Sequence, residues 1–185
     1  MTNARVAAMA FHFMHTHVEI VPAGGTWPDS DALLLPTNDY LWMAEGPALQ
    51  IKKQAGEEIE LEAVRQGPIP MGEVVATHAG QLPFSGILHA AVMGQDLQVD
   101  GEAAAEAVRR GIKTACEKKW GRLLIHSFLG AGRGTRHEVA HVVLRALVDE
   151  LLGGRQLHVV SLLALNETER SVLHEALLHI IQSEG

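Results

Sequence analysis

The residues best placed to do chemistry gather in one stretch, 123–134, where an apolar segment runs into a loop with glycine at positions 130, 132 and 134. A polar start at 135–138 and an amphipathic run to Leu152 follow at once, which predicts a strand, a turn and a helix. Glycines let a backbone approach a ligand closely, and the unpaired N–H groups of a first helical turn favour anions. A phosphate or diphosphate suits this arrangement, whereas the alternative interpretation is an ordinary strand-to-helix turn.

A second strand, loop and helix precede the first in the chain. Residues 31–36 are almost entirely apolar, residues 37–40 interrupt them, and Gly46-Pro47-Ala48 opens a helix predicted to continue to about residue 64. In an α/β sheet, the loops at the carboxyl ends of parallel strands share one edge. We therefore expect the two loops to hold the two ends of one diphosphate.

The remaining elements alternate between strands and helices. Residues 11–21 predict one or two strands, and further strands are expected at 73–78, 87–92 and 157–163. Helices are expected at 101–119, with Asp100 as its cap, and after Asn166. This alternation predicts a three-layer α/β/α fold around a mixed, largely parallel sheet, with residues 1–185 forming one domain.

Bulk properties exclude several classes of protein. A formal net charge of -7 and an isoelectric point near 5.8 argue against a non-specific nucleic-acid binder. The sequence shows no signal peptide and no apolar run of membrane-spanning length, so we expect a cytoplasmic protein without a membrane partner. The single cysteine, Cys116, forbids an internal disulfide and is expected to be a small core residue.

With both loops placed, the sequence resembles the macro domain family from about residue 18 onward. Residues 31–38 look like its strand ending in Asn-Ala-Ala-Asn, and residues 44–56 look like its Gly-Gly-Gly-Val-Ala loop and helix. Residues 129–134 look like its second phosphate loop, and the segments 72–77, 82–83 and 87–89 match in order. The resemblance implies binding of ADP-ribose or a related NAD-derived metabolite, free or attached to a protein, with no cofactor.

The resemblance also implies the ligand contacts. Asn38 would hydrogen-bond the distal ribose or merely hold the loop after its strand. Pro47 lacks an N–H group, so the loop at 46–48 has one hydrogen-bond donor fewer for the diphosphate. Arg133 would either bind phosphate through two hydrogen bonds or point to solvent. The ligand-binding residues expected from both loops are Asn38, Glu45, Gly46, Pro47, Ala48, Leu129, Gly130, Ala131, Gly132, Arg133 and Gly134.

Departures from the family pattern bear on catalysis. The adenine-reading Asp of the family falls on Gly24, and its first loop Asn falls on Leu35. Hydrolytic members carry an Asp and a His where this chain has Ala48 and Lys52. We therefore favour binding without catalysis and expect no catalytic residue, while hydrolysis of ADP-ribosylated protein or O-acetyl-ADP-ribose remains the alternative.

A rival motif, His137-Glu138-Val-Ala-His141, matches H-E-x-x-H, which in zinc hydrolases places two imidazoles and a general base at one metal. Thr135 and Glu138 also form a capping-box pattern, and no third ligand follows at a recognisable spacing. A zinc hydrolase is therefore a remote alternative, and no metal is expected. His15 and His17 would share a strand face as a possible metal pair, but solvated histidines are the favoured interpretation.

Three further polar residues lie in apolar strand segments. His89 and His126 are expected to be satisfied core or strand-end residues with no chemical role. Ser127 lacks the Gly-x-Ser-x-Gly pattern of a nucleophile and is expected to be a structural or ligand-lining hydroxyl.

Overall fold

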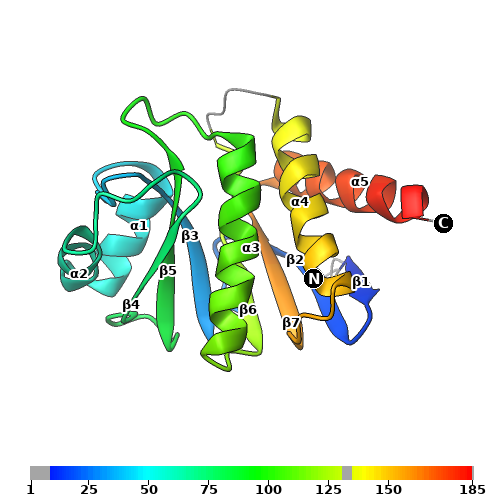
Figure 1. Ribbon diagram of the computed structural model, residues 1–185, viewed down its shortest axis with the longest axis horizontal. Coiled ribbons are helices and arrows are strands. Elements are labelled where there is room, and N and C mark those ends of the chain that lie inside the picture. The colour runs from blue at the N-terminus through cyan, green and yellow to red at the C-terminus, as the bar shows by residue number, and fades with distance from the viewer. Residues whose placement is uncertain (1–8, 131–134, 185) are drawn as a thin grey trace, which may run out of the picture.

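The computed structural model describes residues 9–130 and 135–184, so Ala131, Gly132, Arg133 and Gly134 lie outside the described residues. A seven-stranded sheet forms its centre (Figure 1). The five inner strands run parallel, whereas the edge strands β1 and β4 are antiparallel to their neighbours. In spatial order the strands are β1 (Ala10–Phe13), β2 (Thr16–Pro22), β7 (Val159–Ala164), β6 (Arg122–Ile125), β3 (Ala32–Asn38), β5 (Gly86–Met93) and β4 (Val74–Thr77). The mixed, largely parallel sheet is confirmed.

Strand β3 lies between β6 and β5, and every one of its residues is buried. An uninterrupted apolar run is typical of a strand covered on both faces. The strand continues two residues past the predicted end, because Thr37 and Asn38 still pair with Ala91 and Met93 of β5. The Thr37 hydroxyl also donates to Ala90 O at 3.1 Å.

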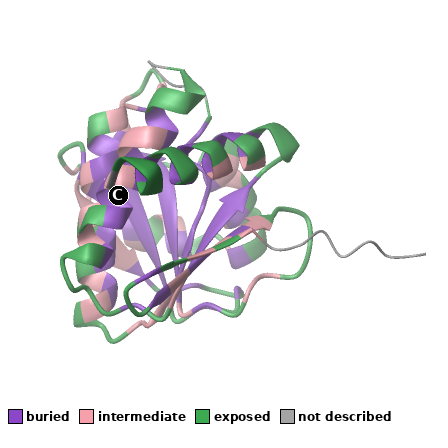
Figure 2. Ribbon diagram, turned by 90° about the vertical axis from the view of Figure 1, so that its right-hand side faces the viewer, coloured by how far each residue is buried: buried purple, intermediate pink, exposed green. Residues whose placement is uncertain are grey.

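Helices cover both faces of this sheet (Figures 1 and 2). The helices α3 (Gly101–Glu117), α4 (Arg136–Leu152) and α5 (Glu167–Glu184) pack over one face and enclose the larger apolar core. The helix α1 (Gly46–Ala55) covers part of the other face, with the short helix α2 (Glu58–Val64) beside β4. The three-layer α/β/α prediction is therefore confirmed.

One predicted helix is in fact two. We expected a single helix from Gly46 to about residue 64, but α1 ends at Ala55 and α2 starts at Glu58. Gly56 adopts φ +108°, a conformation that residues with a side chain rarely enter, and its N–H donates to Lys52 O at 2.9 Å. The apolar spacing continues across the break through Ile59, so the periodicity conceals it.

The predicted helix starts are confirmed by their hydrogen bonds. Asp100 Oδ1 accepts from Ala103 N at 2.9 Å, and Asn166 Oδ1 accepts from Glu169 N at 2.9 Å. Each bond satisfies one of the N–H groups that a first helical turn leaves without an intrahelical partner. Over the ranges 9–130 and 135–184, no helix combines the length and apolar character needed to cross a bilayer.

Candidate functional site

The two predicted ligand loops leave from neighbouring parallel strands. Ala32–Leu34 of β3 pair with Leu123–Ile125 of β6, and the loops after both strands therefore emerge at one edge of the sheet. The β3 loop leads to α1 on one face, whereas the β6 loop leads to α4 on the opposite face. Such a divergence is where open α/β sheets commonly bind ligands.

The Asn38 side chain supports the loop after β3 from within. Its Oδ1 accepts from Tyr40 N at 3.1 Å and from Trp42 N at 3.2 Å, while its Nδ2 donates to Trp42 O at 3.0 Å. Asn38 is only 7% exposed, although Tyr40 and Trp42 are about half exposed. The side chain thus holds the loop, and its contact with a ribose stays a prediction.

A second brace reaches the same loop from α2. Glu60 Oε2 accepts from Met43 N at 2.5 Å, and Lys52 Nζ lies 3.1 and 3.2 Å from the two oxygens of Glu60. The Lys52 and Glu60 side chains are only 18% and 16% exposed. Glu60 was not foreseen as a site residue, because its partner Met43 is 17 residues away and no local pattern signals the contact.

The start of α1 has no side-chain cap. The Glu45 side chain makes no capping bond, and no hydrogen bond in the described part of the chain uses the N–H of Gly46 or Ala48. Gly46 adopts φ +58° and is exposed, and Pro47 follows it. Two unpaired amides at the positive end of a helix are suited to an anion.

The described part of the second loop is anchored to its surroundings. His126 N donates to Leu34 O at 3.0 Å, and Leu129 N donates to Ser127 Oγ at 3.1 Å. Arg136 Nε donates to Leu129 O at 3.2 Å, so the first residue of α4 also holds the loop. Ser127 therefore has the structural contact expected of it. Gly130 is exposed, and among the described residues other than its chain neighbours no atom lies within 4 Å of the place a Cβ would take.

The start of α4 carries a capping box. Thr135 Oγ1 accepts from Glu138 N at 3.2 Å, and Glu138 Oε2 accepts from Thr135 N at 2.6 Å. The bonds from the Thr135 backbone N–H and side chain lower the pKa of the Glu138 carboxyl. The carboxylate is thus engaged at the helix start and not free to act as a general base.

The histidines of the rival motif do not meet at a metal centre. His137 Nε2 lies 3.6 Å from Glu175 Oε2, and the His141 ring makes an edge contact with His179, with centroids 5.4 Å apart. Among residues 9–130 and 135–184, no three His, Cys, Asp or Glu side chains are grouped so that they could hold a metal ion. The geometry of the described residues gives the zinc hydrolase alternative no support.

The shared strand face expected for His15 and His17 is wrong, and Cys116 is not the core residue it was expected to be. His15 is exposed in the turn between β1 and β2, and the part-exposed His17 has its Nδ1 3.3 Å from His12 Nε2 across the two strands. Cys116 is only partly buried and lines a cavity at the opposite edge of the sheet. It lies near the C-terminus of α3, where its Sγ is 4.0 Å from Gln156 O in the connection between α4 and β7.

The buried histidines are held in their neutral form. Burial lowers the pKa of both His89 and His126 to about 4. His89 Nε2 lies 2.9 Å from Thr77 Oγ1, whereas its Nδ1 has no partner among the described atoms. His126 Nδ1 lies 3.5 Å from Ser127 O. Both rings belong to the interior: His89 is fully buried and His126 is 5% exposed.

Comparison with known proteins adds an independent line of evidence. The family model described as Macro domain matches residues 35–142, which include both loops. A protein of Aquifex aeolicus is 33% identical over 134 residues, covering 72% of this chain and 80% of that protein. A protein of Mycobacterium tuberculosis is 32% identical over 117 residues, covering 63% of this chain and 32% of its own length.

Solved structures share the fold. The Oceanobacillus iheyensis macrodomain with MES bound superposes with a TM-score of 0.84 at 24% identity, covering 96% of this chain and 98% of that one. A mutant of the same protein was solved with ADPR (TM-score 0.83, 22% identity, 95% and 100% coverage). A Trypanosoma brucei macrodomain was solved in complex with ADP (TM-score 0.74, 16% identity, 86% and 68% coverage).

Proposed function

Since this chain belongs to the macro domain family, we propose that it binds ADP-ribose, or a close diphosphate-containing relative, between the loop at 45–48 and the loop at 129–134. The observation that carries the proposal is the uncapped start of α1. The strand before α1 is β3, which lies next to β6, the strand that leads into the glycine-rich loop. Structural neighbours solved with ADPR or ADP support the choice of ligand.

The diphosphate would take the place of a cap on α1. The N–H groups of Gly46 and Ala48 would donate to phosphate oxygens, and the helix dipole would favour the negative charge. The second loop would supply backbone donors from 130–134, with the Leu129 carbonyl held by Arg136. Asn38 and Glu60 would act indirectly, by keeping the first loop in its binding conformation before the ligand arrives.

Binding without catalysis is the chemistry these side chains favour. The methyl group of Ala48 can neither activate water nor hold a ribose hydroxyl, and Lys52 is committed to its ion pair with Glu60. A general base must come within hydrogen-bonding reach of the proton it removes. In the loop at 45–48, only Glu45 carries a side chain that could act as a general base. Its carboxylate is exposed and makes no capping bond to the helix, and no described side chain orients it.

Calorimetric titration with ADP-ribose, ADP, AMP and ribose 5-phosphate tests the proposal. We expect ADP-ribose and ADP to bind and AMP to bind at least about tenfold more weakly, since losing one phosphate removes charge-assisted hydrogen bonds. Gly130→Glu should abolish binding by placing a carboxylate beside the phosphate site, and the small, uncharged control Gly130→Ala should retain most of it, because no described atom beyond the chain neighbours lies near the added Cβ.

Two results would contradict the proposal. Equal affinity of the parent protein and Gly130→Glu for ADP-ribose would show that the second loop does not hold the diphosphate. Release of free ADP-ribose from ADP-ribosylated protein or O-acetyl-ADP-ribose, at a rate set by the protein concentration, would show that the chain is a hydrolase and not a binding module.

A further inference from the structure

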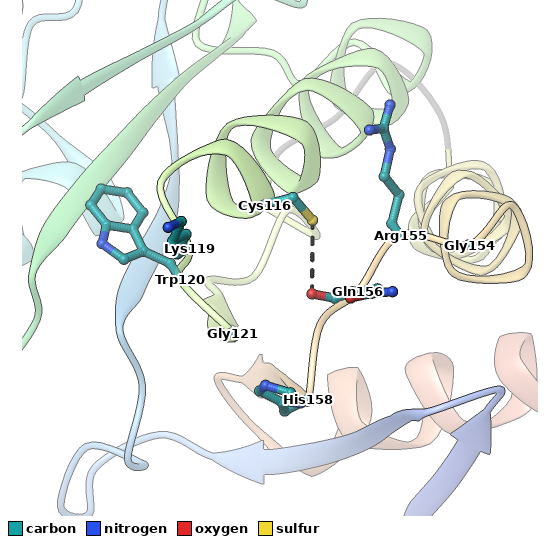
Figure 3. Close-up of a pocket in the computed structure, with 8 residues that line it drawn as sticks. All are labelled: Cys116, Lys119, Trp120, Gly121, Gly154, Arg155, Gln156 and His158. Atoms are coloured by element: carbon teal, nitrogen blue, oxygen red, sulfur yellow. Dashed lines mark hydrogen bonds between the residues drawn. The ribbon is translucent and has the colours of Figure 1, made fainter.

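A cavity of about 420 Å³ lies at the amino ends of β6 and β7, at the edge of the sheet opposite the proposed ADP-ribose loops (Figure 3). Its volume falls within the range of small-molecule sites, about 300–1,000 Å³. Two connections, from α3 to β6 and from α4 to β7, supply the walls. The lining residues are Cys116, Lys119, Trp120, Gly121, Gly154, Arg155, Gln156 and His158.

Backbone hydrogen bonds fix the two walls relative to each other. His158 N donates to Gly121 O at 2.7 Å, and Val159 N donates to the same oxygen at 3.2 Å. The His158 ring lies so close to Gly121 that a Cβ there would be 2.5 Å from its Cδ2. Gly154, at φ +91°, leaves open space where another residue would carry a side chain. The cavity is therefore a built feature of the fold and does not depend on one mobile side chain.

The polar side chains that line the cavity are chiefly donors. They comprise the Lys119 ammonium, the Arg155 guanidinium, the Gln156 amide and the His158 imidazole. No carboxylate is among the described lining residues, although the carboxylates of Glu150 and Glu117 lie near Cys116. Arg155 pairs with Glu150 at 3.1 Å, but the Lys119 ammonium and the His158 ring make no hydrogen bond or ion pair with the described residues. In a protein with a net charge of -7, this collection of donors favours an anionic guest.

Cations near helix C-termini often serve only to satisfy the last carbonyls. Here backbone groups already do so. At the end of α3, Lys118 N, Lys119 N and Trp120 N donate to Thr114 O, Cys116 O and Ala115 O, and at the end of α4 the N–H groups of residues 153–155 do the same. The side chains of Lys119 and Arg155 are therefore not needed as caps.

We propose that this cavity is a second binding site, which takes a small organic anion with one phosphate or carboxylate group. The anionic group lies against Lys119 and His158, beside which Arg155 also lines the cavity, and the body of the ligand lies against Cys116 and Gly121. The Trp120 ring points away from Cys116 (Figure 3), and its outer edge lies against Gly86. The site does not depend on the proposed ADP-ribose function, because its residues lie at the other edge of the sheet.

Titrations of the whole protein with phenyl phosphate, benzoate and neutral benzamide test this site, followed by calorimetry and by NMR shifts of the cavity amides. We expect at least one of the two anions to bind, benzamide to bind at least about tenfold more weakly, and the preferred anion to distinguish phosphate from carboxylate recognition. Lys119→Gln, Arg155→Gln and Gln156→Glu should each weaken anion binding by about tenfold or more.

The matched control is Lys118→Gln, which removes the same charge from the adjacent residue. Lys118 does not line the cavity; its ammonium lies 5.3 Å from the Trp120 ring centroid. The four substituted positions, Lys118, Lys119, Arg155 and Gln156, are all exposed, so the variants should fold. Their affinity for ADP-ribose should not change. The proposal is overturned if neither anion shifts the cavity amides, if benzamide binds as tightly as both anions, or if Lys118→Gln weakens binding as much as Lys119→Gln.

Discussion

Replacing Asn38 with alanine should both destabilise the protein and weaken ADP-ribose binding. The side chain makes three hydrogen bonds to the backbone of Tyr40 and Trp42, at 3.0 to 3.2 Å. Each such bond contributes about 1 kcal/mol, but water can replace part of this in a half-exposed loop, so we expect the free energy of unfolding to fall by about 2 kcal/mol. Without the bonds the loop samples other conformations, and ADP-ribose must order it again on binding.

Urea unfolding measures the change in stability, and hydrogen exchange at the Tyr40 and Trp42 amides measures the local change. Asn38→Asp is the matched variant, because it keeps an oxygen that can accept from both amides but puts a carboxylate oxygen in place of the donor to Trp42 O; its unfolding free energy should fall by about 1 kcal/mol or more. An Asn38→Ala protein with unchanged stability and amide exchange but lost ADP-ribose binding would refute the reasoning, because the side chain would then act on the ligand itself. Unchanged ADP-ribose binding together with faster exchange of the Tyr40 and Trp42 amides would instead show that this loop is not part of the ligand site.

Three further perturbations test other parts of the structure. Burial lowers the pKa of His89 to about 4, so its contribution to stability is fully present above about pH 6.5 and is lost as the pH falls toward 4. Between pH 7 and pH 5, the unfolding free energy of His89→Leu in urea should therefore fall by about 2 kcal/mol less than that of the parent protein. An identical pH dependence of the two proteins would contradict this. Glu60→Ala should lower the free energy of unfolding by about 2 kcal/mol, because Lys52 and Met43 N lose their partner in a mostly buried place. Glu60→Gln should lower it by less. A coupling energy of zero in a double-mutant cycle with Lys52→Met would show that Glu60 and Lys52 are not coupled. Gly80→Ala should lower the free energy of unfolding in urea by about 2 kcal/mol or more, because Gly80 has φ +57° and a Cβ there would lie 2.1 Å from Ala55 O. The control Gly25→Ala should be nearly neutral, because no described atom beyond the chain neighbours lies within 4 Å of the added Cβ. Equal effects of the two variants would show that the structure around Gly80 shifts to accommodate the Cβ.

Much of the fold could be predicted from local sequence. The apolar run in β3 indicates burial on both faces, and each of Asp100, Thr135 and Asn166 marks a helix start that the hydrogen bonds confirm. These features depend on residues within about one helical turn or one strand, so their physical causes are visible in the chain itself. The ordered motifs across residues 31–134 also indicated the family, which the match over residues 35–142 shows.

The break at Gly56 was not predicted, although its cause is also local. A glycine inside an amphipathic pattern is compatible with a continuous helix, and only the contacts of α1 and α2 decide between the alternatives. The same holds for Asn38, for which the sequence left two roles open. Its loop contacts became visible once the path of the chain after β3 was known.

The sequence by itself determined the alternation of strands and helices, the helix starts and the glycine-rich loop. The tertiary structure alone decided that Glu60 would hold Met43 and Lys52 together, and that residues near Cys116 and Gln156, 40 positions apart, would enclose a cavity. The physical reason is the range of the forces involved. Caps, turns and periodic apolar faces act between neighbours in sequence, whereas ion pairs and cavities arise where the sheet topology brings distant segments together.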